Sequence, residues 1–329
     1  MFQFDYLVFI GRFQPFHDGH QAVVRHALTL AKNVMILIGS VNSPRTLKNP
    51  FTYEERVGMI LNAFGKEYDG RILCTPLDDD PYNDVKWLAN VQSTVFHTTG
   101  GVGRVGMIGY HKDKSSYYLS LFPHMEQIFA ENHANLSATP MREAYFGQGL
   151  IDKNLPANVA DFLVNFKNSE EFTNLQREHQ HILDCQKAWQ HTPYPPVFVT
   201  ADALVVQAGH VLLIERGGEY GRGLYALAGG FLDQNETLLE CALRELYEET
   251  GLVIDKNTLK DTQIFDKPDR SARGRTVTSV FYFELFGDAL PEVKGGDDAN
   301  RAFWLPLGEL DGAMMFEDHY GVIVKMLGL

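Results

Sequence analysis

Cysteine is scarce in this chain of 329 residues, which has only Cys74, Cys185 and Cys241, widely spaced and without a CxxC pair. Their odd number and spacing predict neither a disulfide framework nor a zinc site, and are typical of a protein of the reducing cytoplasm. Long apolar runs are also lacking, and no apolar stretch of the sequence is long enough to span a bilayer. The amino terminus has no cationic stretch and its apolar run is broken by Asp5, which argues against a signal peptide.

Positive charge is in short supply as well. Lysine and arginine together number 29 against 42 aspartates and glutamates, so the formal net charge is −13 at pH 7. We do not expect so acidic a chain to bind a nucleic-acid backbone or an anionic membrane. Anionic small molecules remain candidate ligands wherever arginine, histidine and Mg²⁺ gather locally.

The rest of the composition, 45% hydrophobic and 22% charged, is ordinary for a globular protein, and the length suits two cores. In the first half, strand-like runs at residues 6–10, 34–38, 72–75 and 105–109 alternate with helix-compatible segments at 19–31, 52–64 and 84–96. This alternation predicts an α/β domain with a parallel, Rossmann-like sheet and crossover helices.

The pattern changes in the second half. A polar helical region at 157–189 leads to the run His191-Thr-Pro-Tyr-Pro-Pro196, whose prolines end a helix and favour an extended connection. We therefore expect a first domain over residues 1–190, a linker over 191–196 and a second domain over 197–329. Strands predicted at 197–206, 211–215, 276–285 and 301–305, and a helix from about Asp318, give the second domain an α+β pattern.

A strand, a glycine-containing turn and a helix start follow one another in the run Gly11-Arg12-Phe13-Gln14-Pro15-Phe16-His17-Asp18-Gly19-His20. Free backbone N–H groups and the positive end of the helix meet at such a turn, which makes it a site for phosphate. His17 and His20 are three residues apart, so both imidazoles can enter one pocket. A metal-binding pair is an alternative, although no third ligand is nearby, and two structural histidines are another.

A second polar motif, Ser137-Ala-Thr139-Pro-Met-Arg142, follows later in this domain. Serine or threonine before proline is a good helix N-cap, so we expect a helix to begin here. Its amides, the hydroxyl groups of Ser137 and Thr139, and the Arg142 guanidinium can hold a polyphosphate from the other side. Capping alone explains the hydroxyl residues but does not predict the arginine.

These motifs resemble the nucleotidyltransferase superfamily, and GRFQPFHDGH with the later run Asn49-Pro-Phe-Thr-Tyr-Glu-Glu-Arg56 is similar to nicotinamide mononucleotide (NMN) adenylyltransferases of archaeal type. Gln14 favours this branch, because related cytidylyltransferases typically have aspartate there. The resemblance implies that NMN and ATP form NAD and pyrophosphate with Mg²⁺, by positioning and electrostatics and without an enzyme base. His17 and His20 would contact the ATP phosphates, and Arg12 and Arg142 would grip the β- and γ-phosphates.

The same resemblance implies further ATP and NMN contacts. They are Gly11, Arg12, Phe13, Gln14, Ser137, Thr139, Asp80 and Trp87. Trp87 resembles the nicotinamide-stacking residue of the family, with core packing as the alternative, and Asp84 departs from the asparagine that the family often has. The polar run at 109–118 follows a strand, where doubly wound sheets bind ligands.

The second domain contains the pattern Gly230-x5-Glu236-x7-Arg244-Glu245-Leu-x-Glu248-Glu249-x-Gly251-Leu. On a helix, the last three glutamates share one face, where they repel one another unless a hard divalent cation such as Mg²⁺ binds among them. A solvated acidic face is the alternative. The full pattern resembles the Nudix box, which implies a Mg²⁺-dependent hydrolase of nucleoside diphosphates linked to another moiety.

By that resemblance, Glu245, Glu248 and Glu249 would bind the metal and Arg244 would orient a carboxylate. Arg244, Glu245 and Glu249 are therefore the expected catalytic residues. Gly229 and Gly230 are expected to let the backbone approach the metal closely. The general base is expected outside the box, and the acidic loop Gly295-Gly-Asp297-Asp298 is a candidate, with a solvated turn as the alternative.

Substrate choice is expected to depend on Arg270, Arg273 and Arg275, a basic cluster in an acidic chain that suits phosphate or ribose. An ordinary surface loop is the alternative. The Arg-Gly-Arg element and the later Asp-Asp-Ala resemble ADP-ribose pyrophosphatases, which cleave ADP-ribose to AMP and ribose 5-phosphate.

The whole chain thus resembles bifunctional NMN adenylyltransferase/ADP-ribose pyrophosphatases: a Rossmann-like nucleotidyltransferase domain followed by an α+β Nudix domain. The implied ligands are ATP, NMN, NAD, ADP-ribose and Mg²⁺ at both sites, and a homo-oligomer is left open. Three alternatives are kept. The Nudix domain could act on NADH or a dinucleoside polyphosphate, or serve as an ADP-ribose sensor, and the first domain could serve flavin or coenzyme A synthesis.

Overall fold

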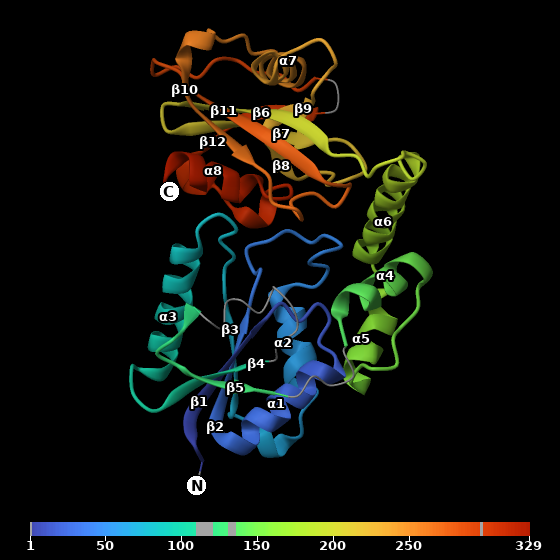
Figure 1. Ribbon diagram of the computed structural model, residues 1–329, viewed down its shortest axis with the longest axis vertical. Helices are drawn as coiled ribbons and strands as arrows, with labels where there is room; N and C mark the ends of the chain where they lie inside the picture. The colour runs from blue at the N-terminus through green and yellow to red at the C-terminus, as the bar shows by residue number, and fades with distance from the viewer. Residues whose placement is uncertain (1, 110–120, 131–135, 297–298) are drawn as a thin grey trace. The chain divides into compact units, whose positions relative to one another are not determined.

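A computed structural model (Figure 1) describes residues 2–109, 121–130, 136–296 and 299–329. The chain forms two compact units, Met1–Gln176 and Arg177–Leu329. The division lies inside a helix, ahead of the segment 191–196 where the sequence predicts the linker. The predicted domain limits, 1–190 and 197–329, stay a prediction.

The first unit alternates strands and helices: β1 (Phe4–Gly11), α1 (Asp18–Leu30), β2 (Ala31–Ile38), α2 (Tyr53–Leu61), β3 (Ile72–Pro76), α3 (Asp84–Thr99), β4 (Val105–Gly109), β5 (Glu126–Phe129), α4 (Ala138–Gln148), α5 (Ala157–Phe166) and the beginning of α6 (Glu170–Ala188). The strands pair in parallel in the order β3-β2-β1-β4-β5. This arrangement confirms the predicted α/β fold with a parallel sheet.

The central strand β1 explains why helices cover both faces of this sheet. Its side chains alternate between faces, so Leu7 and Phe9 enter a core shared with α1, α2 and α5. Val8 and Ile10 enter a second core shared with α3. Figure 1 shows α1 and α2 on one side of the sheet and α3 on the other.

The order of the strands reverses between β1 and β4, and ligands bind parallel sheets beyond the carboxyl ends of the strands at such a point. The loop after β1 begins at Gly11, so the structure places the GRFQPFHDGH run there. Strand β4 ends at Gly109, the first residue of the polar run predicted at 109–118, and residues 110–118 lie outside the described residues.

The second unit is built on a mixed sheet: β6 (Phe198–Gln207), β7 (His210–Arg216), β8 (Tyr225–Ala226), β9 (Ala228–Phe231), α7 (Leu238–Thr250), β10 (Leu259–Phe265), β11 (Thr276–Glu284), β12 (Ala299–Pro306) and α8 (His319–Leu327). The order is β10-β11-β6-β7-β12, with β8 beside β7 and β9 beside β6. Only β11 and β6 run parallel among the described pairs. Helices α7 and α8 lie on opposite sides of this sheet (Figure 1), which confirms the α+β pattern.

Short 3-10 helices complete the described elements, at Lys66–Tyr68, Lys256–Thr258, Leu307–Glu309 and Gly312–Met314. The region predicted as helical at 157–189 is divided into α5 and α6. The hydroxyl group of Ser169 accepts the Phe172 N–H at 3.1 Å and so starts α6. Among the helices that the structure describes, none is long and apolar enough to cross a membrane.

Candidate active sites

The first site is the loop that joins β1 to α1. Its backbone turns into the left-handed region at Phe13, where φ is 54°. This turn folds the buried Phe13 ring back over Gly11, where a Cβ atom would lie only 2.8 Å from the ring. The ring also packs edge-on against His20, with ring centres 5.0 Å apart. Gly11 thus makes room for the Phe13 ring, against which the His20 ring packs.

His17 and His20 form a reciprocal cap at the start of α1. The Nδ1 atom of His17 accepts the His20 N–H at 3.4 Å, and the Nδ1 atom of His20 accepts the His17 N–H at 3.3 Å. The two rings stack with their centres 3.6 Å apart. Because both Nδ1 atoms are acceptors, each neutral ring has its proton on Nε2, where it can be donated to a phosphate oxygen.

Two arginines bring positive charge to this loop. Arg142 of α4 is buried, and its Nη1 donates to the Gln14 carbonyl at 2.7 Å while its Nη2 donates to the Thr139 hydroxyl at 3.3 Å. Burial, and then the nearby Arg12, lower the pKa of Arg142 to about 10. The Nη1 atom of Arg12 is buried and has no hydrogen-bond partner among the described residues. An unused cationic donor in this loop suits a phosphate.

Gln14 holds the loop in place. Its side-chain Nε2 donates to the Phe51 carbonyl and its Oε1 accepts the Phe51 N–H, both at 3.0 Å, and the residue is 1% exposed. Its amide is therefore used on the Asn49-Pro-Phe51 segment. This contact gives a physical reason for the occurrence of both motifs in one chain.

Ser137, Asp80 and Trp87, three more of the predicted ligand contacts of this unit, lie before α4, in the loop before α3 and on α3. Ser137 is the N-cap residue of α4 through its backbone, without a hydrogen bond from its side chain. Asp80 lies 3.8 Å from the Lys86 ammonium. Trp87 of α3 is half-buried and packs edge-on near Phe122, with ring centres 6.3 Å apart, as core packing predicts.

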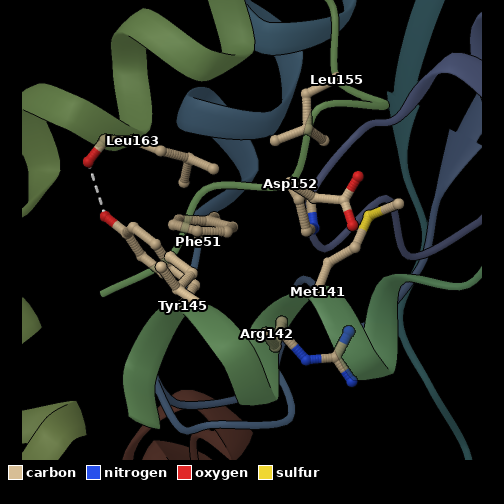
Figure 2. A pocket seen from close by; sticks show the side chains of 9 residues that line it. Phe51, Met141, Arg142, Tyr145, Asp152, Leu155 and Leu163 are labelled. Carbon is tan, nitrogen blue, oxygen red and sulfur yellow. Dashed lines mark hydrogen bonds between the residues drawn. The ribbon is translucent and has the colours of Figure 1, made fainter. Parts of the chain in front are cut away.

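A pocket beside Arg142 lies on the α4 side of the loop (Figure 2). It is lined by Pro15, Phe51, Met141, Arg142, Tyr145, Leu150, Asp152, Leu155 and Leu163. The Tyr145 hydroxyl donates to the Leu163 carbonyl at 2.7 Å. Apart from Arg142 and Asp152, the residues that line this pocket are mostly apolar and have few groups that would bind a nucleotide. The pocket therefore lies behind the phosphate-binding loop and is not its ligand site.

The second site lies on α7, which the Nudix-like pattern predicts. Thr237 starts the helix in a capping box with Glu240, and Gly251 ends it in the left-handed conformation with φ 69°. Cys241 and Leu246 bury one face against the sheet, where α7 contacts β6 and β9. Glu249 is buried on this side as well, while Glu248 is more exposed.

Arg244 gathers the carboxylates of this face. It pairs bidentately with Glu236 at 2.7 and 2.9 Å, and its Nη1 donates to Glu245 at 2.7 Å and Glu248 at 2.9 Å. Arg244, followed by the Asp233 N–H, lowers the pKa of Glu236 to about 2. Arg244 therefore orients Glu245 and Glu248.

Glu249 is the most buried of the three glutamates, at 7% exposed, and its Oε2 accepts the Gly229 N–H at 3.0 Å. Burial raises its pKa to about 8, and Glu245 adds to that rise. A buried carboxylate beside a second one is costly unless a cation is near. Oxygen donors of this kind fit a hard divalent cation. Among the described residues, the three carboxylates do not converge on one point, because Glu245 and Glu248 are hydrogen-bonded to Arg244.

The glycines beside α7 are required by this crowding. At Gly230, a Cβ atom would overlap the Glu245 carboxylate, and at Gly229 it would overlap Asp202 of β6. Asp202 is buried and accepts the Thr278 hydroxyl. Both glycines therefore let β9 approach the acidic side chains.

The three arginines of the predicted substrate cluster have different surroundings. Arg270 is buried in a bidentate pair with Asp318, at 2.9 and 3.0 Å. Arg275 donates to the carbonyls of Lys267 and Thr276 at 3.2 and 3.3 Å. Both guanidinium groups thus hold the turn before β11.

Arg273 differs, because its Nε is buried without a hydrogen-bond partner among the described residues. Its guanidinium carbon lies 5.5 Å from the ring centres of Tyr220 and Phe231. Ser271 in the same turn also has a buried hydroxyl without such a partner. The structure therefore gathers unused donors beside aromatic rings here, which suits a ligand with phosphate and ribose groups.

Sequence reasoning missed Arg216, the last residue of β7. Its guanidinium carbon lies 4.1 Å from the centre of the Phe316 ring, and its Nε donates to the Tyr220 carbonyl at 3.2 Å. Burial, and then Arg273, lower its pKa, while Glu249 acts in the opposite direction. The only available signal was an arginine that ends an apolar strand.

The acidic loop predicted to supply the general base touches α7. Lys294 N–H donates to the Thr250 carbonyl at 3.0 Å, and Gly296 N–H donates to the Glu249 carbonyl at 3.2 Å. Asp297 and Asp298 themselves lie outside the described residues. Their role as the base stays a prediction.

Comparison with known proteins defines the class. Residues 8–86 match the cytidylyltransferase-like family, and residues 197–326 match the NUDIX domain family. The chain is therefore a nucleotidyltransferase joined to a Nudix hydrolase, and the Nudix domain implies a divalent metal.

Individual relatives match each half and the whole. The nicotinamide/nicotinic acid mononucleotide adenylyltransferase of Acinetobacter baylyi is 43% identical over 55% of this chain and 96% of that protein. The ADP-ribose pyrophosphatase of Methanocaldococcus jannaschii is 36% identical over 34% of this chain and 63% of that protein. A bifunctional NMN adenylyltransferase/ADP ribose pyrophosphatase of Francisella tularensis, crystallised with AMP and a manganese ion, is 34% identical over 99% of both chains, with a TM-score of 0.91. The chain belongs to this bifunctional family, which confirms the resemblance.

Proposed function

We propose that the first unit makes NAD from NMN and ATP, and that the second hydrolyses ADP-ribose to AMP and ribose 5-phosphate. One observation carries the proposal at both sites. Each keeps a cationic side chain with a buried, unused donor, Arg12 Nη1 in the first and Arg273 Nε in the second. Buried cationic donors of this kind are stabilised by phosphate oxygens. The full-length similarity to the Francisella tularensis protein supports the choice of substrates.

In the synthetic reaction, an oxygen of the NMN phosphate attacks the α-phosphorus of ATP, and the bond to the bridging oxygen breaks to release pyrophosphate. Because NMN supplies the nucleophile, the protein positions the reactants and stabilises charge. The Nε2–H groups of His17 and His20 would donate to phosphate oxygens, while Arg12 and Arg142 hold the leaving pyrophosphate. Bound Mg²⁺ would neutralise part of the polyphosphate charge.

In the hydrolytic reaction, a water oxygen attacks one phosphorus of ADP-ribose and the bond to the bridging oxygen breaks. Glu245, Glu248 and Glu249 would hold Mg²⁺, which supplies charge neutralisation and a more acidic water when bound. Arg244 keeps the first two carboxylates oriented. Arg273 would bind the diphosphate or a ribose. The retention of all three carboxylates supports hydrolysis over a sensor that only binds ADP-ribose.

His20→Asn tests the synthetic assignment without removing the helix cap. The asparagine oxygen can replace Nδ1 as acceptor of the His17 N–H, but it has no counterpart of Nε2–H. We expect NAD formation to fall roughly a hundredfold or more, as for loss of a charge-stabilising donor, with the unfolding midpoint nearly unchanged. ADP-ribose hydrolysis in the same variant is the internal control. Unchanged NAD formation would contradict the assignment.

AMP release from a panel of ADP-ribose, NADH and a dinucleoside polyphosphate tests the hydrolytic assignment. Glu249→Gln should lose hydrolysis of every member, because the amide is a poor ligand for Mg²⁺. Arg273→Lys should lose most on ADP-ribose, since lysine cannot make the same forked contact. If ADP-ribose is the poorest substrate of the wild type, the assignment to ADP-ribose is wrong and another diphosphate takes its place.

We further propose Mg²⁺ at both sites and the cytoplasm as the compartment. The oxygen donors of α7 and the polyphosphate substrate support the metal, and three free cysteines support a reducing compartment. Activity after chelation and return of Mg²⁺ or Mn²⁺ tests the metal at each site separately.

A further inference from the structure

Arg56 is an almost fully buried cation, 1% exposed, in the first turns of α2. Within the described residues, its four side-chain hydrogen bonds all go to main-chain carbonyl oxygens. A buried arginine usually pairs with a carboxylate, so this use of a guanidinium group calls for a physical explanation.

The four carbonyls belong to segments that meet at the carboxyl ends of β1 and β2. Nη1 donates to Arg12 at 2.9 Å and to Gly39 at 2.6 Å, Nη2 donates to Ser40 at 3.4 Å, and Nε donates to Thr52 at 3.1 Å. The side chain therefore ties the peptide of the phosphate-binding Arg12 to the turn after β2 and to the start of α2.

The turn after β2 is held from its other side as well. Ser40 is in the left-handed region with φ 55°. Its N–H donates to the Asp79 carboxylate at 3.3 Å, and its hydroxyl donates to the other oxygen of the same carboxylate. The Arg56 guanidinium donates to the carbonyl of Ser40. Asp79 and Arg56 thus hold the turn from two sides, and Arg56 is the buried support.

The charge of Arg56 also matters, because none of its hydrogen bonds within the described residues goes to a carboxylate. Burial lowers its pKa to about 10, Asp79 opposes that shift and Arg12 adds to it. The group is still protonated near neutral pH. Arg12, Arg56 and Arg142 therefore form a cationic centre that a bound polyphosphate would neutralise.

We propose that Arg56 is a positioning residue for ATP, which fixes the Arg12 peptide against the Gly39–Ser40 turn so that the Arg12 guanidinium meets the triphosphate. This inference rests on the proposed adenylyltransferase function. Arg56 does not itself touch the reacting atoms. It acts through the backbone of Arg12 and through its positive charge.

Arg56→Lys tests the proposal in the full-length protein. Lysine keeps the charge, but one ammonium on a flexible stem cannot reach four carbonyls in the forked geometry. We expect the KM for ATP to rise about tenfold while the KM for NMN changes less than about twofold, since misplacement affects the triphosphate contacts. The upward shift of the unfolding midpoint by ATP should shrink in the same variant.

Arg71→Lys is the matched control. Arg71 also donates to three main-chain carbonyls, those of Leu28, Ala31 and Lys32 at 2.8 to 3.0 Å, but at the amino end of β2. It should lower the unfolding midpoint without changing the KM for ATP. A purely structural role for Arg56 would give the same result as this control.

A folded Arg56→Lys variant with an unchanged KM for ATP would overturn the proposal, as would an equal rise in Arg71→Lys. If the lysine variant does not fold, Arg56→Gln takes its place, with the same rise expected. Failure of both to fold would assign Arg56 to the fold alone. If the wild type forms no NAD from NMN and ATP, the adenylyltransferase proposal fails, while the ATP-dependent shift still tests Arg56.

Discussion

Gly230 lies so close to the Glu245 carboxylate that any side chain there would overlap it. In Gly230→Ala the flexible carboxylate has to move, while the backbone can stay in place. We therefore expect ADP-ribose hydrolysis to fall roughly a hundredfold, the usual effect of a misplaced catalytic group, with little change in the unfolding midpoint. Steady-state kinetics and thermal unfolding measure the two effects.

Gly308→Ala is the control for this change, because a Cβ atom there meets nothing within 4 Å. It should leave hydrolysis unchanged. Equal activity of Gly230→Ala and wild type would show that Glu245 tolerates displacement, and would weaken its assignment to the metal.

His319, the first residue of α8, makes the second unit sensitive to acid. It is buried, its Nδ1 accepts the Leu227 N–H at 3.0 Å, and burial lowers its pKa to about 3. The unfolded chain takes up a proton near pH 6.5 and the folded chain does not. The stabilisation is therefore complete above about pH 6.5 and is lost as pH falls toward 3.

At pH 5 this loss amounts to about 2 kcal/mol of the free energy of unfolding. His319→Asn should remove that part of the pH dependence, because asparagine can accept the Leu227 N–H without titrating. Urea unfolding of both proteins at pH 5 and pH 7.5 measures the difference. Equal pH dependence of the two would exclude His319 as the cause.

The sequence indicated which residue types lie near the sites, but it did not reveal which of them have a free donor and which have a partner. Arg270, Arg273 and Arg275 look alike in the sequence, but only Arg273 keeps an unused buried donor. Arg270 is occupied by Asp318, a partner 48 positions later in the chain that no local pattern reveals. The caps formed by Nδ1 atoms of His17 and His20 are equally invisible, since they depend on ring orientation.

At the scale of elements, the second half of α6 is part of the second unit. Ile182 is 7% exposed, the His181 ring lies over Tyr220 with centres 6.4 Å apart, and Gln186 donates to the Ala272 carbonyl at 3.4 Å. A fragment of residues 177–329 should therefore be more stable than one of residues 191–329. The difference should be about 2 kcal/mol, the value of one buried isoleucine.

Thermal and urea unfolding of the two fragments measures this difference, with ADP-ribose hydrolysis as the readout of an intact site. Equal midpoints for the two fragments would return α6 entirely to the first unit.

The elements predicted from the sequence were those with a strong apolar pattern. The predicted strand at 105–109 coincides with β4, and the helix predicted from about Asp318 begins at His319. Strands β5, β8, β9 and β10 were missed. They are short or polar, as in the sequence LKDTQIF of β10, whose place at the edge of the sheet leaves much of it exposed. Such strands are formed by their neighbours and not by their own propensity.

At the scale of the whole molecule, the order of the two enzyme domains could be predicted because each domain contains its own local sequence motif, and the family matches confirm that order. The division into two compact units inside α6 has no such motif. The prolines at 191–196 give a clear local signal, whereas a helix shared by two cores looks like any other polar helix.

The shared helix has a consequence for recombination between members of this family. A chimaera joined at the proline-rich segment would bring a foreign half-helix to the second core, with unmatched side chains where Ile182 and His181 lie. A junction between Gln176 and Arg177 would give each core the part of α6 with which it evolved. A junction inside this helix should therefore preserve both cores better than a junction at the prolines.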